Sequence, residues 1–257
     1  LRKSKEAIFR HSEVLERKVV RQIPDGSYSA EGFLDNDGIT NNPIKIKINI
    51  KVKGEKLHVN LAGSSKQTKG PVNTGLAQTI SALRVAFKCL INPDRPVDGG
   101  TFKTLSVEAP EGSIFKSKKP AAAAWYFSSL GLLIDAFVKA LSPVLKEKVA
   151  SAHYGDSMIV VISGEDPETR VPWITLEAET GGWGGFKKGD GADALINNVN
   201  GGFKDMPIEI TETKFPLRIK NYGLRNDTGG AGKTRGGCGT YREFTLMKDS
   251  NLSLWWE

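Results

Sequence analysis

The chain has 257 residues, of which 39% are hydrophobic and 25% charged, and it carries a formal net charge of +7. This composition is typical of a globular protein and excludes an intrinsically disordered chain. The positive charge raises nucleic-acid binding as a hypothesis, but most lysines alternate with apolar residues along predicted strands or flank loops. No basic stripe interleaved with aromatic residues is present in the sequence, so we expect a solvated basic face or an acidic partner subunit, and no nucleic-acid ligand.

The cysteines and the apolar stretches bear on the cellular compartment. Cys89 and Cys238 are far apart without CxxC spacing, which predicts neither a disulfide framework nor a zinc knuckle and fits a reducing, cytoplasmic environment. The sequence shows no signal peptide. The longest apolar stretch, residues 121–145, contains Asp135 and Lys139. Charges are rare inside membrane spans, so this stretch predicts a buried helix and no membrane segment.

The first third of the chain predicts one helix followed by strands. Apolar residues at helical spacing predict a helix over residues 4–21, with Ser4 as its N-cap. A turn at residues 24–26 leads into a half-buried strand over residues 28–34. Between residues 44 and 53, isoleucine and valine alternate strictly with lysine and asparagine, which predicts a strand with one face in the core. A tight turn and a second alternating run complete a hairpin.

The rest of the chain predicts two more helices, further strands and long loops. Asn73 is the expected cap of a helix that Pro93 and Pro96 end, and a second helix is expected over residues 128–141. Short strands are expected near residues 158–162 and 174–179, and the chain is glycine-rich from 181 to 239. This order predicts an α+β fold with a mixed, largely antiparallel sheet, a few packed helices and long Gly-rich loops.

The segment TGGAGKT at residues 228–234 is similar to a phosphate-binding P-loop. That motif requires glycine where Asp227 stands, and it requires a helix to follow. The next residues, RGGCG at 235–239, are poor helix formers. We therefore reject the P-loop and expect a tight structural turn in preference to a substrate cradle, because glycine permits close backbone approach.

Metal-binding motifs are equally incomplete in the sequence. The DNDG run at residues 35–38 is similar to part of a calcium loop, but Phe33 and Ile44 stand where that loop needs carboxylate ligands. A turn at the end of a strand is the expected structure. The three histidines show no metal-binding spacing. The sequence therefore predicts no metal site in this chain.

The densest carboxylates near the glycine-rich region are the candidate catalytic groups. Glu209 and Glu212 follow Pro207, and Asp190 and Asp193 precede them. A carboxylate can act as a general base, orient a nucleophile or bind a metal. We take Glu209 and Glu212 as candidate catalytic residues, the alternative being that they are solvated or ion-paired. If their segment is a strand, they point to opposite faces, so only one can face a site.

Short motifs along nearly the whole chain, taken in order, resemble the hydantoinase B/oxoprolinase family. The motifs are IPDGSY at 23–28, LDNDG at 34–38, LAGSSKQ at 61–67, GPVN at 70–73, APEGS at 109–113, PA at 120–121, GGWG at 181–184, DG at 190–191, MPIE at 206–209 with Glu212, and DTGGAG at 227–232 with RGG at 235–237. The resemblance implies that residues 1–257 are the C-terminal part of a B-type subunit, with a sub-division into 1–125 and 126–257.

The resemblance also implies an activity and partners. Family members work with an A-type subunit that binds ATP and Mg, and they open cyclic amides or carboxylate ketones through a phosphorylated intermediate. The implied partners are that A-type subunit, the N-terminal half of the B-type subunit and a small-molecule substrate. The resemblance leaves room for a divalent metal in that N-terminal half. Asp190, Gly229, Gly230 and Arg235 are then expected to bind substrate or form loops. The chain alone is expected to be inactive, and a non-catalytic docking element of the same complex is the alternative.

Overall fold

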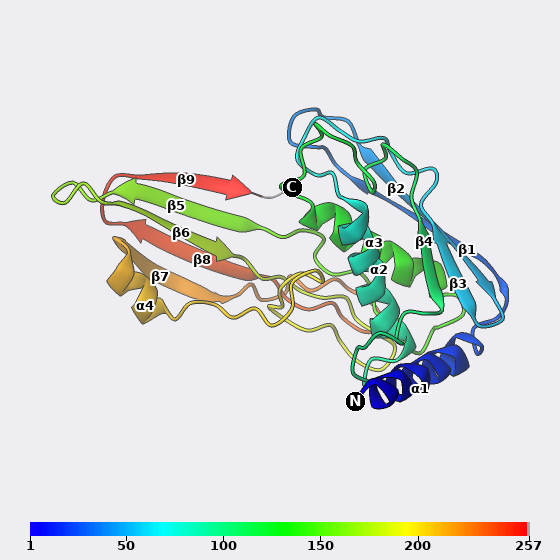
Figure 1. Ribbon diagram of the computed structural model, residues 1–257. Helices are drawn as coiled ribbons and strands as arrows, with labels where there is room; N and C mark the ends of the chain where they lie inside the picture. Colours follow the sequence, from blue (N-terminus) through cyan, green and yellow to red (C-terminus); the bar gives the residue numbers. More distant parts are fainter. Residues whose placement is uncertain (256–257) are drawn as a thin grey trace. The chain divides into compact units, whose positions relative to one another are not determined.

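The computed structural model describes residues 1–255 and divides the chain into two compact units, Leu1–Val149 and Ala150–Glu257 (Figure 1). The division follows the third helix, whereas the sub-division expected from the sequence precedes it. Within the described residues, four helices accompany one four-stranded mixed sheet and two smaller antiparallel sheets. This arrangement confirms the predicted α+β fold. None of the helices in residues 1–255 is long and apolar enough to cross a membrane.

The first unit begins with helix α1 (Arg2–Val20), which lies against helix α2 and strand β3. Leu1 stands at the N-cap position, so the expected cap at Ser4 is wrong by one turn. Most of α1 is exposed, and its buried residues are Glu16 and Val20. Only a narrow stripe of this helix therefore contributes to the core.

The mixed sheet of the first unit has the order β1-β2-β3-β4. Strands β1 (Gly26–Leu34), β2 (Ile44–Lys53) and β3 (Lys56–Asn60) are antiparallel, and β4 (Leu105–Glu108) runs parallel to β3. The alternation along β2 is confirmed, because its isoleucines and valine are buried while its lysines and asparagine are partly or fully exposed. The hairpin of β2 and β3 is confirmed in the same way.

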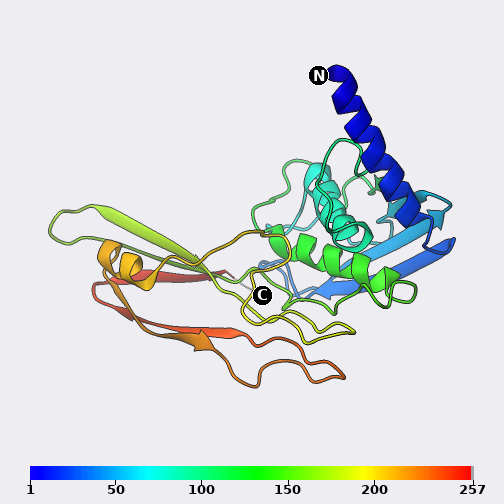
Figure 2. The same ribbon diagram turned by 90° about the horizontal axis from the view of Figure 1, so that it is seen from below.

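Helices α2 (Leu76–Ile91) and α3 (Phe127–Leu141) pack on each other, and α3 lies across β1 and β2 (Figure 2). The prediction that Asn73 caps α2 is wrong, because Gly75 occupies the N-cap position. The Asn73 amide instead donates to the carbonyl oxygens of Thr68, Gly70 and Ala122. Asn73 thus fixes the loop before the helix, since a buried amide must find hydrogen-bond partners within the protein.

The DNDG run forms the expected turn after β1. The buried Asp37 carboxylate accepts N–H bonds from Ile39, Thr40 and Gly70 at 3.0, 2.5 and 3.0 Å. Both of its oxygens are therefore engaged by backbone donors. A built-on Cβ at Gly70 would lie 1.7 Å from the Asp37 carbonyl oxygen, so only glycine fits there.

The second unit is a pair of antiparallel sheets (Figure 2). Strands β5 (Ile159–Glu165), β6 (Pro172–Ala178) and β9 (Ser250–Trp255) form one sheet in the order β6-β5-β9. Strands β7 (Leu217–Leu224) and β8 (Thr240–Leu246) form the other, and the short helix α4 (Ile208–Lys214) precedes β7. The sheets share a small apolar cluster of Val160, Ile162 and Leu217, against which Trp173, Phe215 and Phe244 pack.

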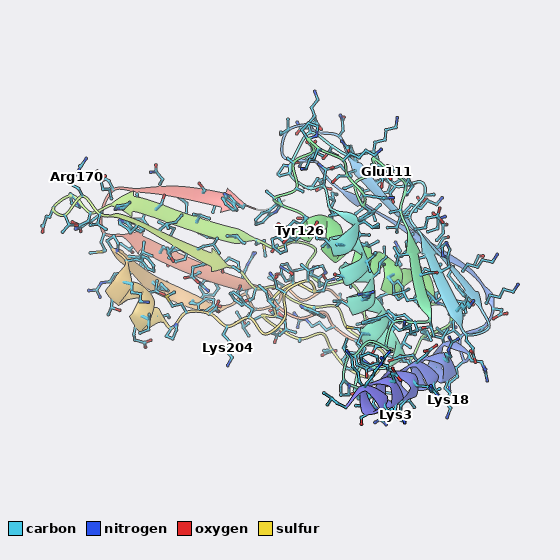
Figure 3. The ribbon with its side chains drawn as sticks, viewed as in Figure 1. Lys3, Lys18, Glu111, Tyr126, Arg170 and Lys204 are labelled. Carbon is cyan, nitrogen blue, oxygen red and sulfur yellow. The ribbon has the colours of Figure 1, made fainter. Side chains whose placement is uncertain are left out.

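Strand β6 buries polar side chains and exposes apolar ones, which is the reverse of an ordinary half-buried strand. Thr175 and Glu177 are each 4% exposed, whereas Ile174 and Leu176 are 64% and 54% exposed. Figure 3 shows Arg170 at the tip of the connection between β5 and β6. Burial of apolar side chains normally decides which face of a strand points inward. A polar or charged partner on the inner face must therefore offset the cost of burying the Glu177 carboxylate.

Candidate functional site

A cleft of about 780 Å³ lies entirely within the second unit. We call it the glycine-rich cleft, and its lining residues are Ser151, Ala152, Tyr154, Met158, Thr180, Gly181, Gly182, Trp183, Gly184, Gly185, Arg225, Thr228, Gly230, Ala231, Gly232, Lys233, Thr234, Gly236, Gly237, Gly239 and Thr240. Its volume is in the range of sites that bind small molecules. The segment that the sequence likens to a P-loop forms one of its walls, and no helix follows that segment within residues 1–255.

Several glycines around the cleft are required by close backbone packing. A built-on Cβ would lie 1.9 Å from the Gly237 carbonyl oxygen at Gly182, and 2.0 Å from the Gly236 carbonyl oxygen at Gly229. No side chain can be placed at such distances, so these positions build the loops. Gly230 differs, because a Cβ there would have no neighbour within 4 Å. Close backbone packing therefore accounts for Gly229, while Gly230 borders open space in the cleft, and the choice between a structural turn and a substrate cradle stays a prediction.

Two aspartates tie the glycine-rich loops together. Asp190 Oδ1 accepts the backbone N–H of Arg235 at 2.7 Å, and Asp193 Oδ1 accepts that of Cys238 at 2.5 Å. The Arg235 guanidinium pairs with Asp227 at 2.9 Å. Asp190, Gly229 and Arg235 therefore have visible loop-forming contacts. Their expected part in substrate binding stays a prediction, as it does for Gly230.

The candidate catalytic residues Glu209 and Glu212 lie on helix α4 rather than on a strand. Residues three apart on a helix lie on the same side, so the expectation of opposite faces does not apply. Glu209 is exposed, and Glu212 accepts the backbone N–H of Ile219 at 2.9 Å. Neither residue lines the glycine-rich cleft. Their catalytic role stays a prediction.

A buried ionic network lies between the two sheets, and the sequence did not predict it. The Arg242 guanidinium on β8 lies 3.0 Å from Glu177, 3.7 Å from Glu179 and 3.3 Å from Asp205. It also stacks over the Tyr222 ring at 4.2 Å, and the Tyr222 hydroxyl donates to Asp205. Arg242 is thus the compensating charge that allows Glu177 to point inward, because a buried carboxylate needs a close partner.

Three carboxylates around one guanidinium leave an excess of negative charge. Burial raises the pKa of Glu179 above its usual value, and nearby Asp205 and Glu177 add to the effect, although Arg242 opposes it. Polar residues at alternate positions of β6, followed by an arginine on a later strand, are the only sequence signal of this network. The pattern could not reveal that these segments meet.

The network adjoins one wall of the cleft along the chain. Thr240 Oγ1 donates to the Thr180 carbonyl oxygen at 2.7 Å, and both threonines line the cleft. Glu179 immediately precedes Thr180, and Arg242 is two residues beyond Thr240 on the same strand. Alternate residues on a strand share a face, so Arg242 and Thr240 point the same way. The ion pairs therefore hold the wall that the two threonines form.

Residues 1–255 contain no group of three or more His, Cys, Asp or Glu side chains that could hold a metal ion. His58 contacts Ser106 and Glu108 instead, with its ring nitrogens 2.9 and 3.4 Å from their oxygens. The chemistry available at the cleft is therefore that of backbone N–H groups, hydroxyls and two cationic side chains.

Fold and site together define an α+β protein of two units with a cleft of small-molecule size. The chain matches the model of the hydantoinase B/oxoprolinase family over residues 1–257, and it belongs to this family. The resemblance seen in the sequence motifs is thereby confirmed.

Similar proteins include components of known enzymes. The chain is 31% identical to the B-type component of a putative D-/L-hydantoinase of Pseudomonas sp. strain NS671, over 97% of this chain and 43% of that protein. It is 28% identical to the beta component of the caprolactamase of Pseudomonas jessenii, over 90% of this chain and 41% of that protein. The chain therefore spans less than half the length of these relatives.

Two solved structures share the fold. The ATP-dependent caprolactamase of Pseudomonas jessenii matches with a TM-score of 0.85 and 26% identity, covering 94% of this chain and 42% of the other. Nucleotide-free acetone carboxylase matches with a TM-score of 0.82 over 94% of this chain and 35% of the other. The identity to acetone carboxylase is 18%, so that likeness speaks to the fold alone.

Proposed function

We propose that this chain is part of the B-type subunit of an ATP-dependent enzyme that opens a cyclic amide or carboxylates a ketone. The family match over all 257 residues carries the proposal, and the hydantoinase and caprolactamase relatives support the amide-opening branch. The partners are an A-type subunit, which binds ATP and Mg, and the remainder of the B-type subunit, which is where a divalent metal would reside.

The proposed reaction proceeds through a phosphorylated intermediate. Neutral amides and ketones lack a good leaving group or a strongly electrophilic carbon, and phosphorylation of a carbonyl or enol oxygen, or of bicarbonate, supplies one. A chain that contributes to such a reaction has to position a small polar molecule. The glycine-rich cleft supports this role, because it has the required size and is bordered by hydroxyls, backbone N–H groups and cations.

Substrate class is tested with the assembled enzyme, which consists of the complete B-type subunit and its A-type partner. We expect ATP-dependent ring opening of hydantoin, 5-oxoproline or caprolactam, or ATP- and bicarbonate-dependent consumption of acetone. Each reaction is measured with and without ATP. Failure of every substrate to be consumed in the presence of ATP contradicts the proposal.

The contribution of the cleft is tested with Gly230→Leu. A Cβ at residue 230 would meet no atom within 4 Å, so a leucine side chain begins in open space and would narrow the cleft. Gly201→Leu is the matched control, because residue 201 also has free space and lies outside the cleft. We expect Gly230→Leu alone to lower kcat/KM by at least about tenfold, the effect of losing about 1.4 kcal/mol of transition-state stabilisation.

A docking element without a catalytic role is the second candidate. The outward-facing Ile174 and Leu176 of β6 and the exposed Leu252 and Leu254 of β9 favour it, because large exposed apolar side chains are typical of interaction surfaces. In that case Gly230→Leu leaves the kinetics unchanged, and only substitutions on these strands weaken assembly.

A further inference from the structure

We propose that the glycine-rich cleft binds an oxyanion, namely a carboxylate or phosphate group carried by a small molecule. The inference deepens the proposed function, and it rests on that function only for the expectation that the ligand is a phosphorylated or carboxylated compound. Its physical basis lies in the charges and the backbone donors around the cleft.

The charged residues that line the cleft are both cationic. Arg225 and Lys233 border it, and no aspartate or glutamate of residues 1–255 is among its lining residues. Both side chains are exposed, and neither forms an ion pair with any other residue in positions 1–255. Two cations around one concave surface attract anions, and the low-dielectric walls strengthen that attraction.

The acidic residues close to the cleft have partners of their own. Glu179, next to the lining residue Thr180, belongs to the buried network around Arg242. Asp227 pairs with Arg235 at 2.9 Å. Asp190 and Asp193 accept backbone N–H groups of the segment 235–238. Their charges are therefore partly neutralised by fixed donors, while Arg225 and Lys233 are left to act on a ligand.

Free backbone donors lie on residues that line the cleft. Ala231, Gly232, Lys233 and Thr234 are consecutive, and their N–H groups bond to no acceptor within the described part of the chain. Adjacent glycines leave such groups open to close approach, because no Cβ shields them. Backbone N–H groups together with arginine and lysine side chains are the usual ligands of carboxylate and phosphate oxygens.

The Thr228 hydroxyl holds the backbone from which Arg225 projects. Thr228 is fixed, because its Oγ1 donates to the Arg225 carbonyl oxygen at 2.7 Å and accepts the Gly239 N–H at 3.0 Å. This contact holds the Arg225 backbone against the opposite strand. Arg225 therefore projects from a fixed backbone, whereas Lys233 belongs to the loop and can adjust to the ligand.

The test is calorimetric titration of the complete B-type subunit, without ATP or the A-type partner, in low-chloride buffer. Inorganic phosphate and acetate are the probes. We expect saturable binding of phosphate, acetate or both. Binding of phosphate alone would assign the site to phosphate groups, and binding of acetate would assign it to carboxylates. Loss of one charge-assisted hydrogen bond should weaken binding by about tenfold, so Arg225→Ala and Lys233→Ala should each have an effect of that size.

The matched control removes two positive charges from the same unit but outside the cleft. Lys214→Ala with Arg218→Ala serves this purpose, because both side chains are exposed and neither lines the cleft. We expect this control to bind phosphate as tightly as the unmodified protein. The inference is overturned if neither anion binds saturably, or if Arg225→Ala and Lys233→Ala bind as tightly as the control.

Anion binding and turnover are separate readouts. Failure of the titration leaves the proposed reaction standing, since the reaction can use another surface. Suppose that the unmodified protein binds the anion and Lys233→Ala does not, but no substrate is consumed in the presence of ATP. That result contradicts the proposed function and leaves the anion site standing.

Discussion

Asp37 lies in the turn after β1, and the pKa of its carboxylate is set by opposing effects. Burial by itself raises this pKa, but the backbone N–H groups of Thr40, Gly70 and Ile39 and the Thr40 hydroxyl favour the charged form and lower it to about 2. The unfolded value is near 3.8. Because the folded pKa is the lower one, ionised Asp37 stabilises the folded state above about pH 4, and this contribution is lost as the pH falls toward 2.

We therefore predict that Asp37→Asn lowers the free energy of unfolding at neutral pH by on the order of 2 kcal/mol. The asparagine side chain has one accepting oxygen where the carboxylate has two. Its NH₂ group would therefore face a backbone N–H, which is also a donor. The difference from the unmodified chain should shrink toward pH 2. Urea unfolding at pH 7 and at pH 3 measures it, and Asp35→Asn, an exposed neighbour, is the control. A constant difference at both pH values contradicts the assignment.

Glu209 and Glu212 are distinguished by their contacts. Glu209 is exposed in the first turn of α4, whereas Glu212 holds the Ile219 N–H. We predict that Glu209→Gln lowers turnover of the assembled enzyme by about 10²–10⁴-fold, the usual effect of losing a general acid or base. Glu212→Ala should instead lower stability by about 1 kcal/mol. Steady-state kinetics and thermal melts separate the two, and unchanged kinetics in Glu209→Gln rule out its catalytic role.

At the scale of elements, α1 is joined to α2 by a buried ion pair. Glu16 on α1 is 1% exposed, and its carboxylate lies 3.5 Å from Lys88 Nζ. Burial raises the pKa of Glu16, although Lys88 opposes the shift. Such a pair contributes little net stability, but removing one partner leaves an uncompensated charge.

We predict that Lys88→Met destabilises the chain by about 3 kcal/mol, whereas Lys88→Met combined with Glu16→Leu is close to neutral. The reason is that the double substitution removes both desolvated charges. A double-mutant cycle in chemical unfolding measures the coupling. If the single and the double variant lose the same stability, the pair does not fasten α1 to α2.

Helix α4 was not predicted, and strand β6 was predicted without the correct inner face. The run PIEIT at residues 207–211 contains β-branched residues at alternate positions, which is typical of a strand, yet it begins a seven-residue helix. Such a short helix depends on its tertiary contacts more than on its propensity. In β6 the alternation was visible in the sequence, but the choice of inner face depended on Arg242, a partner 65 residues away from Glu177.

At the scale of the whole molecule, the second unit presents apolar side chains on both outer strands of its three-stranded sheet. Ile174 and Leu176 lie on β6, and Leu252 and Leu254 lie on β9. Exposed apolar residues on sheet edges favour association with other chains. The hydantoinase and caprolactamase relatives are themselves components of multi-chain enzymes, which is consistent with such contacts.

We predict that the 257-residue chain by itself self-associates in sedimentation velocity runs. Ile174→Ser together with Leu176→Ser should shift it toward a monomer, because these changes remove apolar area that water otherwise contacts. Val97→Ser, at an equally exposed position of the first unit, is the control and should change nothing. A monodisperse monomer before substitution contradicts the prediction.

The same preparation should show no catalytic turnover. The sequence has no nucleotide-binding motif, and residues 1–255 hold no gathered metal ligands. We therefore expect neither ATP hydrolysis nor hydantoin opening without the A-type partner. Hydrolysis of either compound by the purified chain alone would show that it carries its own active site.

The sequence by itself determined the elements whose patterns are local. The strict alternation of β2, the helical spacing of α3 and the turn at residues 35–38 depend on neighbouring residues, so they could be predicted. The family motifs were likewise visible, because they are contiguous. Only the tertiary structure decided the cap of α2, the inward Glu177, and the cleft between glycine-rich segments. Each depends on groups distant in sequence, and the hydrogen bonds and charges that compensate their burial exist only once the chain has folded.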